Sequence, residues 1–129
     1  MRHVLLATAL ITIPVTSLTA APAAAQSPEL EQACITVAKN FLLTPALKTG
    51  MVQSFPELDP PGARLTYSTR DKPEATDFTD QIECSFERAT APFGLTRFCV
   101  SDTCYSASEE KPEHRRRFEE MKALLARQK

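Results

Sequence analysis

The chain has 129 residues, with 15 lysines and arginines against 16 aspartates and glutamates, so its formal net charge is −1 at pH 7. A chain so close to neutral lacks the basic surface that attracts nucleic acids and anionic membranes, so neither is expected as a partner. Its length suits one domain. The composition includes four cysteines and no tryptophan.

Residues 1–25 have the pattern of a secretory signal peptide. Arg2 precedes an apolar run at residues 4–13, and three alanines ending at Ala25 provide a small-residue cleavage site. The apolar run is shorter than the roughly 20 residues that a membrane-spanning helix needs, which disfavours an uncleaved anchor. Cleavage would leave Gln26 as the first residue of a mature periplasmic or secreted protein with no membrane span.

Residues 27–44 carry the signals of an amphipathic helix. Ser27 is a suitable N-cap, and Pro28 is tolerated in the first turn. Apolar side chains recur at helical spacing at Leu30, Cys34, Val37 and Phe41. This spacing predicts a helix that covers a sheet and carries Cys34 towards it. Pro45 should end the helix near Thr44.

The segment that follows is predicted to contain no strand. Thr44 and Pro45 indicate a second cap, which opens one or two helical turns that Gly50 closes. Residues 51–62 contain three of the ten prolines. This composition favours a stiff connection between the first helix and the sheet.

Three later segments are predicted to be antiparallel strands. They are residues 63–69, 81–88 and 95–100. Apolar and polar residues alternate in the first two, which places Cys84 on the core side. A turn at residues 91–94 precedes the third. The sequence therefore predicts an α+β domain over residues 26–107, with a small three-stranded antiparallel sheet covered by the N-terminal helix.

Residues 108–129 are predicted to form a charged, amphipathic C-terminal helix. Ser106 with Glu109 fits a capping box, and Ser108 is an alternative cap. The apolar stripe consists of His114, Phe118, Met121 and Leu125. This stripe is narrow, and the sequence leaves open whether it docks on the domain or awaits a partner.

The cysteines are predicted to form two disulfides, because four cysteines in a short exported chain indicate an oxidising compartment. Cys34 and Cys84 lie on core-facing stripes of a helix and a strand, so they can meet. Cys99 points to the opposite face and lies across a tight turn from Cys104. We therefore predict the pairs Cys34–Cys84 and Cys99–Cys104. Zinc is disfavoured because only one pair is closely spaced, and a dithiol redox centre because no C-x-x-C motif is present.

Few residues are suited to catalysis. After cleavage, His114 is the one histidine that could activate a serine or cysteine nucleophile, and it lies in a highly charged helix. Helix starts and the loop at residues 70–80 account for most acidic residues, so no carboxylate pair for glycoside hydrolysis is predicted. We expect no enzymatic activity, no cofactor and no metal.

Arg115, Arg116 and Arg117 form the most concentrated basic run. Glutamates three or four residues away can pair with much of this charge on a helix. The alternative is that the three arginines bind an acidic partner.

Several short motifs resemble a family of small exported proteins of alphaproteobacterial type. They are QACITVAKNFLLTP, I-x-C-x-F, FCV and RRRFEEMKALL, together with the alanine-rich leader. The resemblance implies periplasmic localisation and no activity. The leading hypothesis is a non-enzymatic domain that binds a protein or an envelope component. The runner-up is an inhibitor of an exogenous hydrolase such as lysozyme, and a small hydrolase is third.

Overall fold

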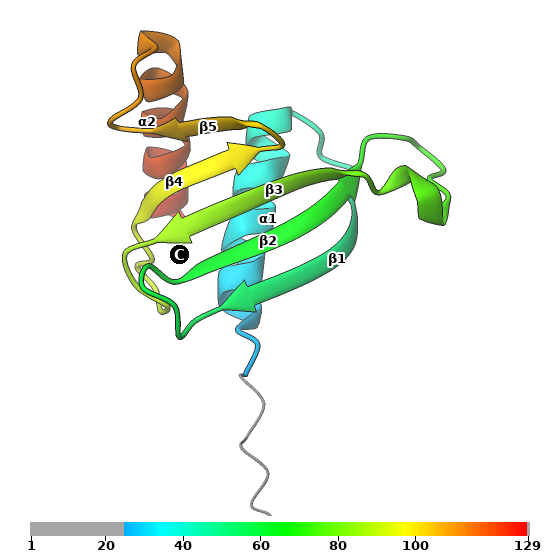
Figure 1. The fold of residues 1–129 in the computed structure, drawn as a ribbon, viewed down its shortest axis with the longest axis horizontal. Helices are drawn as coiled ribbons and strands as arrows, with labels where there is room; N and C mark the ends of the chain where they lie inside the picture. Colours follow the sequence, from blue (N-terminus) through cyan, green and yellow to red (C-terminus); the bar gives the residue numbers. More distant parts are fainter. Residues whose placement is uncertain (1–24, 129) are drawn as a thin grey trace, which may run out of the picture.

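The computed structural model describes residues 25–128, so the predicted signal peptide lies outside the described residues apart from Ala25. The elements follow in the order α1 (Pro28–Leu42), β1 (Lys48–Phe55), β2 (Gly62–Ser68), the short 3-10 helix η1 (Ala75–Asp77), β3 (Asp80–Phe86), β4 (Leu95–Val100), β5 (Thr103–Ser106) and α2 (Pro112–Arg127) (Figure 1). This is an α+β fold with two helices and one antiparallel sheet, as the sequence predicts, but the sheet has five strands instead of three.

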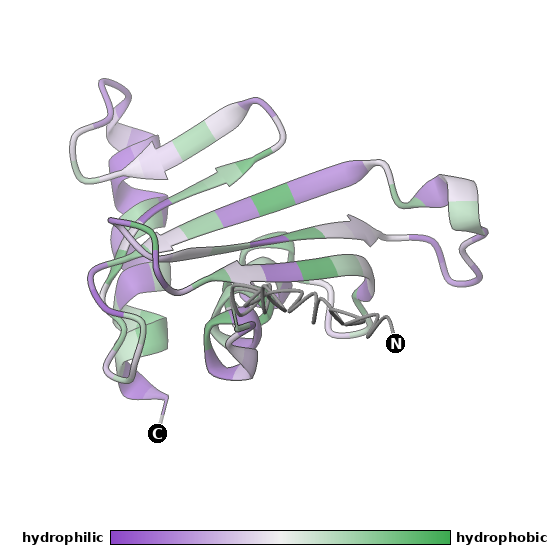
Figure 2. Cartoon of the chain, turned by 60° about the horizontal axis from the view of Figure 1, so that its bottom comes forward, coloured by the Kyte–Doolittle hydropathy of each residue, from purple (hydrophilic) through white to green (hydrophobic). Residues whose placement is uncertain are grey.

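The five strands pair in chain order, each antiparallel to the next. Cys84 of β3 lies opposite both Ala63 of β2 and Phe98 of β4, and all three side chains are buried. Because neighbouring residues on paired strands share a face, this row marks the apolar side of the sheet. Hydrophobic and hydrophilic residues alternate along the strands, as Figure 2 shows.

Helices α1 and α2 pack on the same face of the sheet and contact each other. One hydrophobic core is shared by the sheet, α1 and α2. Its largest fully buried side chains are Phe86, Phe98, Phe118, Leu30, Leu65, Ile82, Leu95 and Val37. The opposite face carries polar residues such as Arg64 and Glu83, and no described helix packs over it. No described helix is both long enough and apolar enough to cross a membrane.

Helix α1 has the predicted start and end. The Ser27 side chain accepts a hydrogen bond from the Leu30 amide (3.3 Å), so it is the N-cap. Leu43 has a left-handed conformation (φ 53°) and its amide donates to the Lys39 carbonyl, which ends the helix two residues before Pro45. The buried face includes Cys34 and Val37, in agreement with the predicted stripe.

The prediction of helical turns and a connection between residues 44 and 62 was wrong, because this segment contains β1. Two local features hide the strand. The pairing register shifts between Thr49 and Val52, which interrupts the alternation. The inward residue Ser54 is polar, yet it is only 2% exposed, and its hydroxyl donates to Glu31 of α1 (3.0 Å). Pro45 lies before β1, and the other three prolines of the segment lie in the turn that follows the strand.

Strand β5 is the second strand missing from the prediction. It has four residues, too few for an alternating pattern to stand out. The predicted tight turn between Cys99 and Cys104 is confirmed, because the register of β4 and β5 places these two cysteines opposite each other and Val100 opposite Thr103.

Helix α2 begins later than predicted, at Pro112, with Lys111 as its N-cap residue. The predicted capping box is instead a tight turn before the helix, in which the Ser106 hydroxyl donates to Glu109 (3.1 Å). The helix is docked: Phe118 is 1% exposed and Met121 is 5% exposed within the common core. The apolar stripe that the sequence left open is therefore covered by the domain itself.

Both predicted cysteine pairs are within disulfide distance in the structure. Cys34 of α1 and Cys84 of β3 are fully buried and join the first helix to the centre of the sheet. Cys99 and Cys104 face each other across the β4–β5 hairpin on the opposite side of the sheet. The two pairs therefore lie on different faces, as the phase of the strands predicted.

Candidate binding groove

The three arginines of the basic run have different surroundings. Arg115 donates to the backbone carbonyls of Glu109 (2.6 Å) and Glu110 (2.8 Å), which holds the turn before α2. Arg116 forms a surface ion pair with Glu120 (3.7 Å), and its side chain is 71% exposed. Arg115 and Arg117 are two residues apart on the helix, so their side chains point in different directions. These two arginines therefore form no common basic surface.

Arg117 connects α2 to the end of α1. Its guanidinium lies 4.5 Å above the centre of the Phe41 ring and donates to the Phe41 carbonyl (2.9 Å). The last carbonyls of a helix lack helical partners and carry partial negative charge, so a cation stabilises this end. Arg117 therefore has a structural role within the domain.

His114 is half-buried, with its ring 4.8 Å from the ring of Tyr105. The aromatic contacts continue from Tyr105 to Phe41 (4.8 Å) and Phe98 (4.9 Å). These contacts join the first turn of α2 to β5, β4 and α1. In residues 25–128, no three histidine, cysteine or acidic side chains converge in a way that could hold a metal ion.

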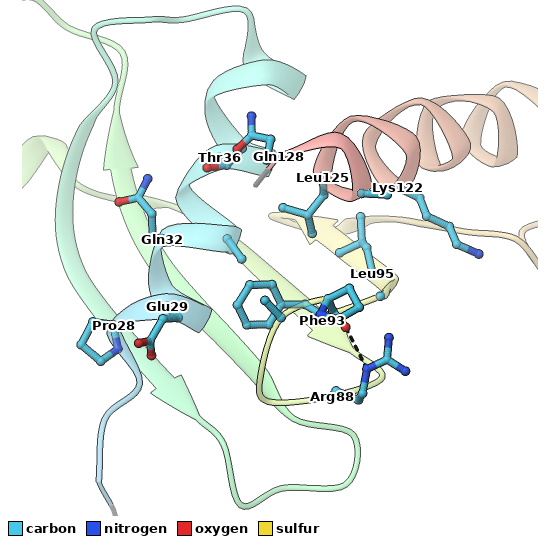
Figure 3. A pocket seen from close by; sticks show the side chains of 15 residues that line it. Pro28, Glu29, Gln32, Thr36, Arg88, Phe93, Leu95, Lys122, Leu125 and Gln128 are labelled. Carbon is cyan, nitrogen blue, oxygen red and sulfur yellow. Dashed lines mark hydrogen bonds between the residues drawn. The ribbon is translucent and has the colours of Figure 1, made fainter.

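A groove with a volume of about 700 Å³ opens between the two helices and the loop that connects β3 to β4. Figure 3 shows the groove from close by. Its lining residues are Pro28, Glu29, Gln32, Ala33 and Thr36 of α1, Arg88, Ala91, Pro92, Phe93, Gly94 and Leu95 of the loop and the start of β4, and Lys122, Leu125, Ala126 and Gln128 at the end of α2. We call this feature the groove.

One wall of the groove is a single side of α1. Its residues recur every three or four positions, which is the spacing of one helical face: Glu29, Gln32, Ala33 and Thr36. Ala33 is nearly buried and contributes a small side chain, which leaves open space beside the helix. Glu29 and Gln32 are exposed at the rim.

The wall formed by the β3–β4 loop is held by hydrogen bonds at its base. The Glu87 amide donates to the Gly94 carbonyl (2.8 Å), and the Arg88 amide donates to the Phe93 carbonyl (3.0 Å). Gly94 has φ +67°, and a Cβ atom there would lie 2.6 Å from the Glu87 carboxylate, so glycine is needed at this position. The loop therefore continues the hairpin and holds Phe93 in place.

Phe93 and Leu125 form the apolar centre of the groove. The Phe93 ring packs 5.8 Å from the ring of the core residue Phe86. Leu125 of α2 packs against the edge of the core from the other side. Leu95, which is 1% exposed, lies at the base. In Figure 3 the side chains of Phe93, Leu95 and Leu125 come from different elements and gather in the middle of the view.

Charged side chains occur on two sides of the groove. Arg88 of the loop and Lys122 of α2 lie on the right of Figure 3, and Glu29 of α1 lies on the left. The Arg88 Nε atom donates to the Pro92 carbonyl (2.8 Å), which orients the guanidinium. Among the described residues, Lys122 has no carboxylate within 4.0 Å, and its ammonium lies 5.9 Å from the Phe118 ring. The groove thus combines an apolar centre with a cationic side.

The groove was not predicted from the sequence. Residues 91–94 were predicted to form a turn, and Leu125 was placed on the apolar stripe of the C-terminal helix. One local signal was present, because Phe93 is a large apolar residue in a loop where solvent exposure would be expected. The distance of this loop from α1 and α2 in the sequence gives no indication that the three meet.

Comparisons of the chain with protein-family models, with curated proteins and with solved structures find no match. The geometry and chemistry of the groove are therefore the basis on which a function is inferred.

Proposed function

We propose that the protein is a non-enzymatic, exported binding domain whose ligand is a component of the cell envelope and whose binding site is the groove. The observation that carries this proposal is the volume of about 700 Å³ around Phe93 and Leu125. Small-molecule sites have volumes of roughly 300–1,000 Å³, with apolar walls and a few polar groups that orient the ligand. The groove has this size and this distribution of side chains.

The way in which the groove is held supports a preformed site. The loop wall is fixed by the backbone hydrogen bonds at Glu87 and Arg88, and α1 is tied to β3 through the Cys34–Cys84 pair. A ligand that enters a preformed site does not have to order the protein, which lowers the free-energy cost of binding. The two cysteine pairs and the predicted signal peptide support an exported protein.

A neutral apolar dye tests the groove without any contribution from charge. We expect N-phenyl-1-naphthylamine to bind the protein with an increase in fluorescence. The substitution Ala126→Trp places a large side chain from the exposed surface of α2 into the groove, and we expect it to abolish this signal.

Ala123→Trp is the matched control, because Ala123 is exposed on the same helix and does not line the groove. This variant should bind the dye as the unmodified protein does. Dye binding that is equally strong in the two variants would disprove the groove as the site, and inhibition of lysozyme by the pure protein would favour the inhibitor hypothesis instead.

A further inference from the structure

We propose that the groove recognises a single-chain amphiphile with an anionic head, of the class of a long-chain carboxylate. The tail would lie over Phe93 and Leu125, and the carboxylate would lie between Arg88 and Lys122. This inference rests on the proposed function, since it names the ligand class of the same groove. Its test is designed so that the two proposals can fail separately.

The apolar centre of the groove favours a tail over a flat protein surface. Protein–protein interfaces of standard size bury roughly 800 Å² on each partner and spread over many side chains. Here the apolar centre is small and its surface is concave, because Phe93, Leu95 and Leu125 gather between two helices and a loop. A flexible chain of methylene groups can fill a concave space of this kind, and its burial is favourable in proportion to the apolar area removed from water.

The cations on the rim specify the sign of the head group. The Arg88 Nε atom is used by the Pro92 carbonyl, while its Nη1 atom has only an exposed contact with Glu87 at 3.7 Å. Lys122 has no acidic partner among the described residues within 4.0 Å. Both side chains can therefore form charge-assisted hydrogen bonds with a carboxylate, which are stronger than neutral ones.

Glu29 determines the direction in which the ligand lies. Among residues 25–128 it is the one carboxylate that lines the groove, and it belongs to α1, across from the loop and α2. An anionic head would be repelled at that side and attracted at the side of Arg88 and Lys122. A cationic head would be attracted to Glu29 and repelled by the two positive charges of Arg88 and Lys122. The charges of the groove thus discriminate between amphiphiles that have the same tail and different head groups.

The test uses dodecanoate, dodecanol and dodecyltrimethylammonium, each below its critical micelle concentration, as competitors of the neutral dye. All three have the same tail length. We expect dodecanoate to displace the dye at a concentration about tenfold lower than dodecyltrimethylammonium does, with dodecanol between them. Lys122→Met should weaken displacement by dodecanoate by about threefold to tenfold and leave displacement by dodecanol unchanged.

Lys72→Met is the control for the change in net charge, because Lys72 is exposed in the loop before η1, at the opposite end of the sheet from α2 (Figure 1). It should leave displacement by all three competitors unchanged. Equal displacement by the three heads, with dye binding still sensitive to Ala126→Trp, would overturn the carboxylate proposal and leave the groove as a site. Absence of dye binding would overturn the proposed function itself.

An anionic membrane surface is the competing source of negative charge. Sedimentation with phosphatidylglycerol vesicles, combined with no effect of monomeric dodecanoate, would overturn the proposal in favour of surface binding. We expect no sedimentation, because the chain has a net charge of −1 and, in the part that the structure describes, two cations line the groove.

Discussion

Arg117 shows how one side chain can serve the fold although its sequence context suggested a partner. It lies in a run of three arginines, but its guanidinium is used inside the domain by the ring and the carbonyl of Phe41. The interaction joins the first half of α2 to the last turn of α1. These two helices form two sides of the groove, so Arg117 also helps to set the distance between them.

We expect Arg117→Met to lower the free energy of unfolding by about 1–2 kcal/mol, because it removes the hydrogen bond to the Phe41 carbonyl and the cation–π contact. Urea unfolding monitored by circular dichroism measures the change. Arg116→Met is the matched control on the same helix. Its ion pair with Glu120 is exposed, so this variant should change the stability by no more than about 0.5 kcal/mol. Equal losses for the two variants would contradict the structural role of Arg117.

Tyr67 makes the stability of the fold depend on pH in the alkaline range. Its side chain is 5% exposed, and it lies opposite Asp80 across the β2–β3 pair. Burial, and secondarily the negative charge of Asp80, raise the pKa of Tyr67 above its usual value of 10.0. Both causes disfavour the charged phenolate in the folded protein.

The sign of the effect follows from the two protonation equilibria. Below pH 10.0 the side chain is neutral in the folded and unfolded states, and the folded state keeps its full stability. As the pH rises further, the unfolded chain loses the phenolic proton first, so the free energy of unfolding falls.

Tyr67→Phe should remove this part of the pH dependence. Urea unfolding at several pH values, with both disulfides oxidised, compares the variant with the unmodified protein. We expect the unmodified protein to lose stability relative to the variant above pH 10.0. Parallel curves over the same interval would show that Tyr67 does not contribute.

At the scale of elements, the two cysteine pairs have different tasks. Cys34–Cys84 joins α1 to the central strand β3 and closes a loop of 50 residues. Cys99–Cys104 joins two neighbouring strands that are already paired, and its sequence separation is 5. Arg97 donates to the Cys104 sulfur (3.0 Å) on the open face of the sheet. The first pair holds the layers together, whereas the second supports a hairpin.

The double variants C34A/C84A and C99A/C104A separate these tasks. The chain-entropy model gives a loss of about 4 kcal/mol for the long loop and about 2 kcal/mol for the short one. The first variant also leaves space in the core, because Cys34 and Cys84 are fully buried, so its loss should be the larger. Thermal unfolding of both variants tests the order, and a larger loss for the Cys99–Cys104 pair would reverse this interpretation. The hairpin variant should still bind the dye.

For the whole molecule, the position of α2 is the feature on which the groove depends. The helix could have projected from the domain with its narrow stripe exposed. Instead, Phe118 and Met121 complete the core, and this places Lys122, Leu125 and Ala126 beside the β3–β4 loop. The binding site is therefore a product of how three elements pack, since no single element contains it.

Local chemistry determined those parts of the fold that the sequence predicted. A serine cap and helical spacing defined α1, and the alternation of side chains defined β2 and β3. The phase of the strands separated Cys84 from Cys99 and so indicated both cysteine pairs. These signals act over a few residues, because capping hydrogen bonds and side-chain direction depend only on near neighbours.

The tertiary structure decided the rest. Strand β1 forms beside β2, with its buried Ser54 bonded to Glu31 of α1, and the four-residue β5 forms beside β4. The groove brings together parts of α1, the β3–β4 loop and the end of α2, which are far apart in the chain. Residue spacing does not show that these three segments lie side by side, because their proximity results from the packing of helices on a sheet around one core. The sequence by itself determined the two helices, the strands β2, β3 and β4 and the cysteine pairs, whereas tertiary pairing added β1 and β5 and the packing of all these elements created the groove.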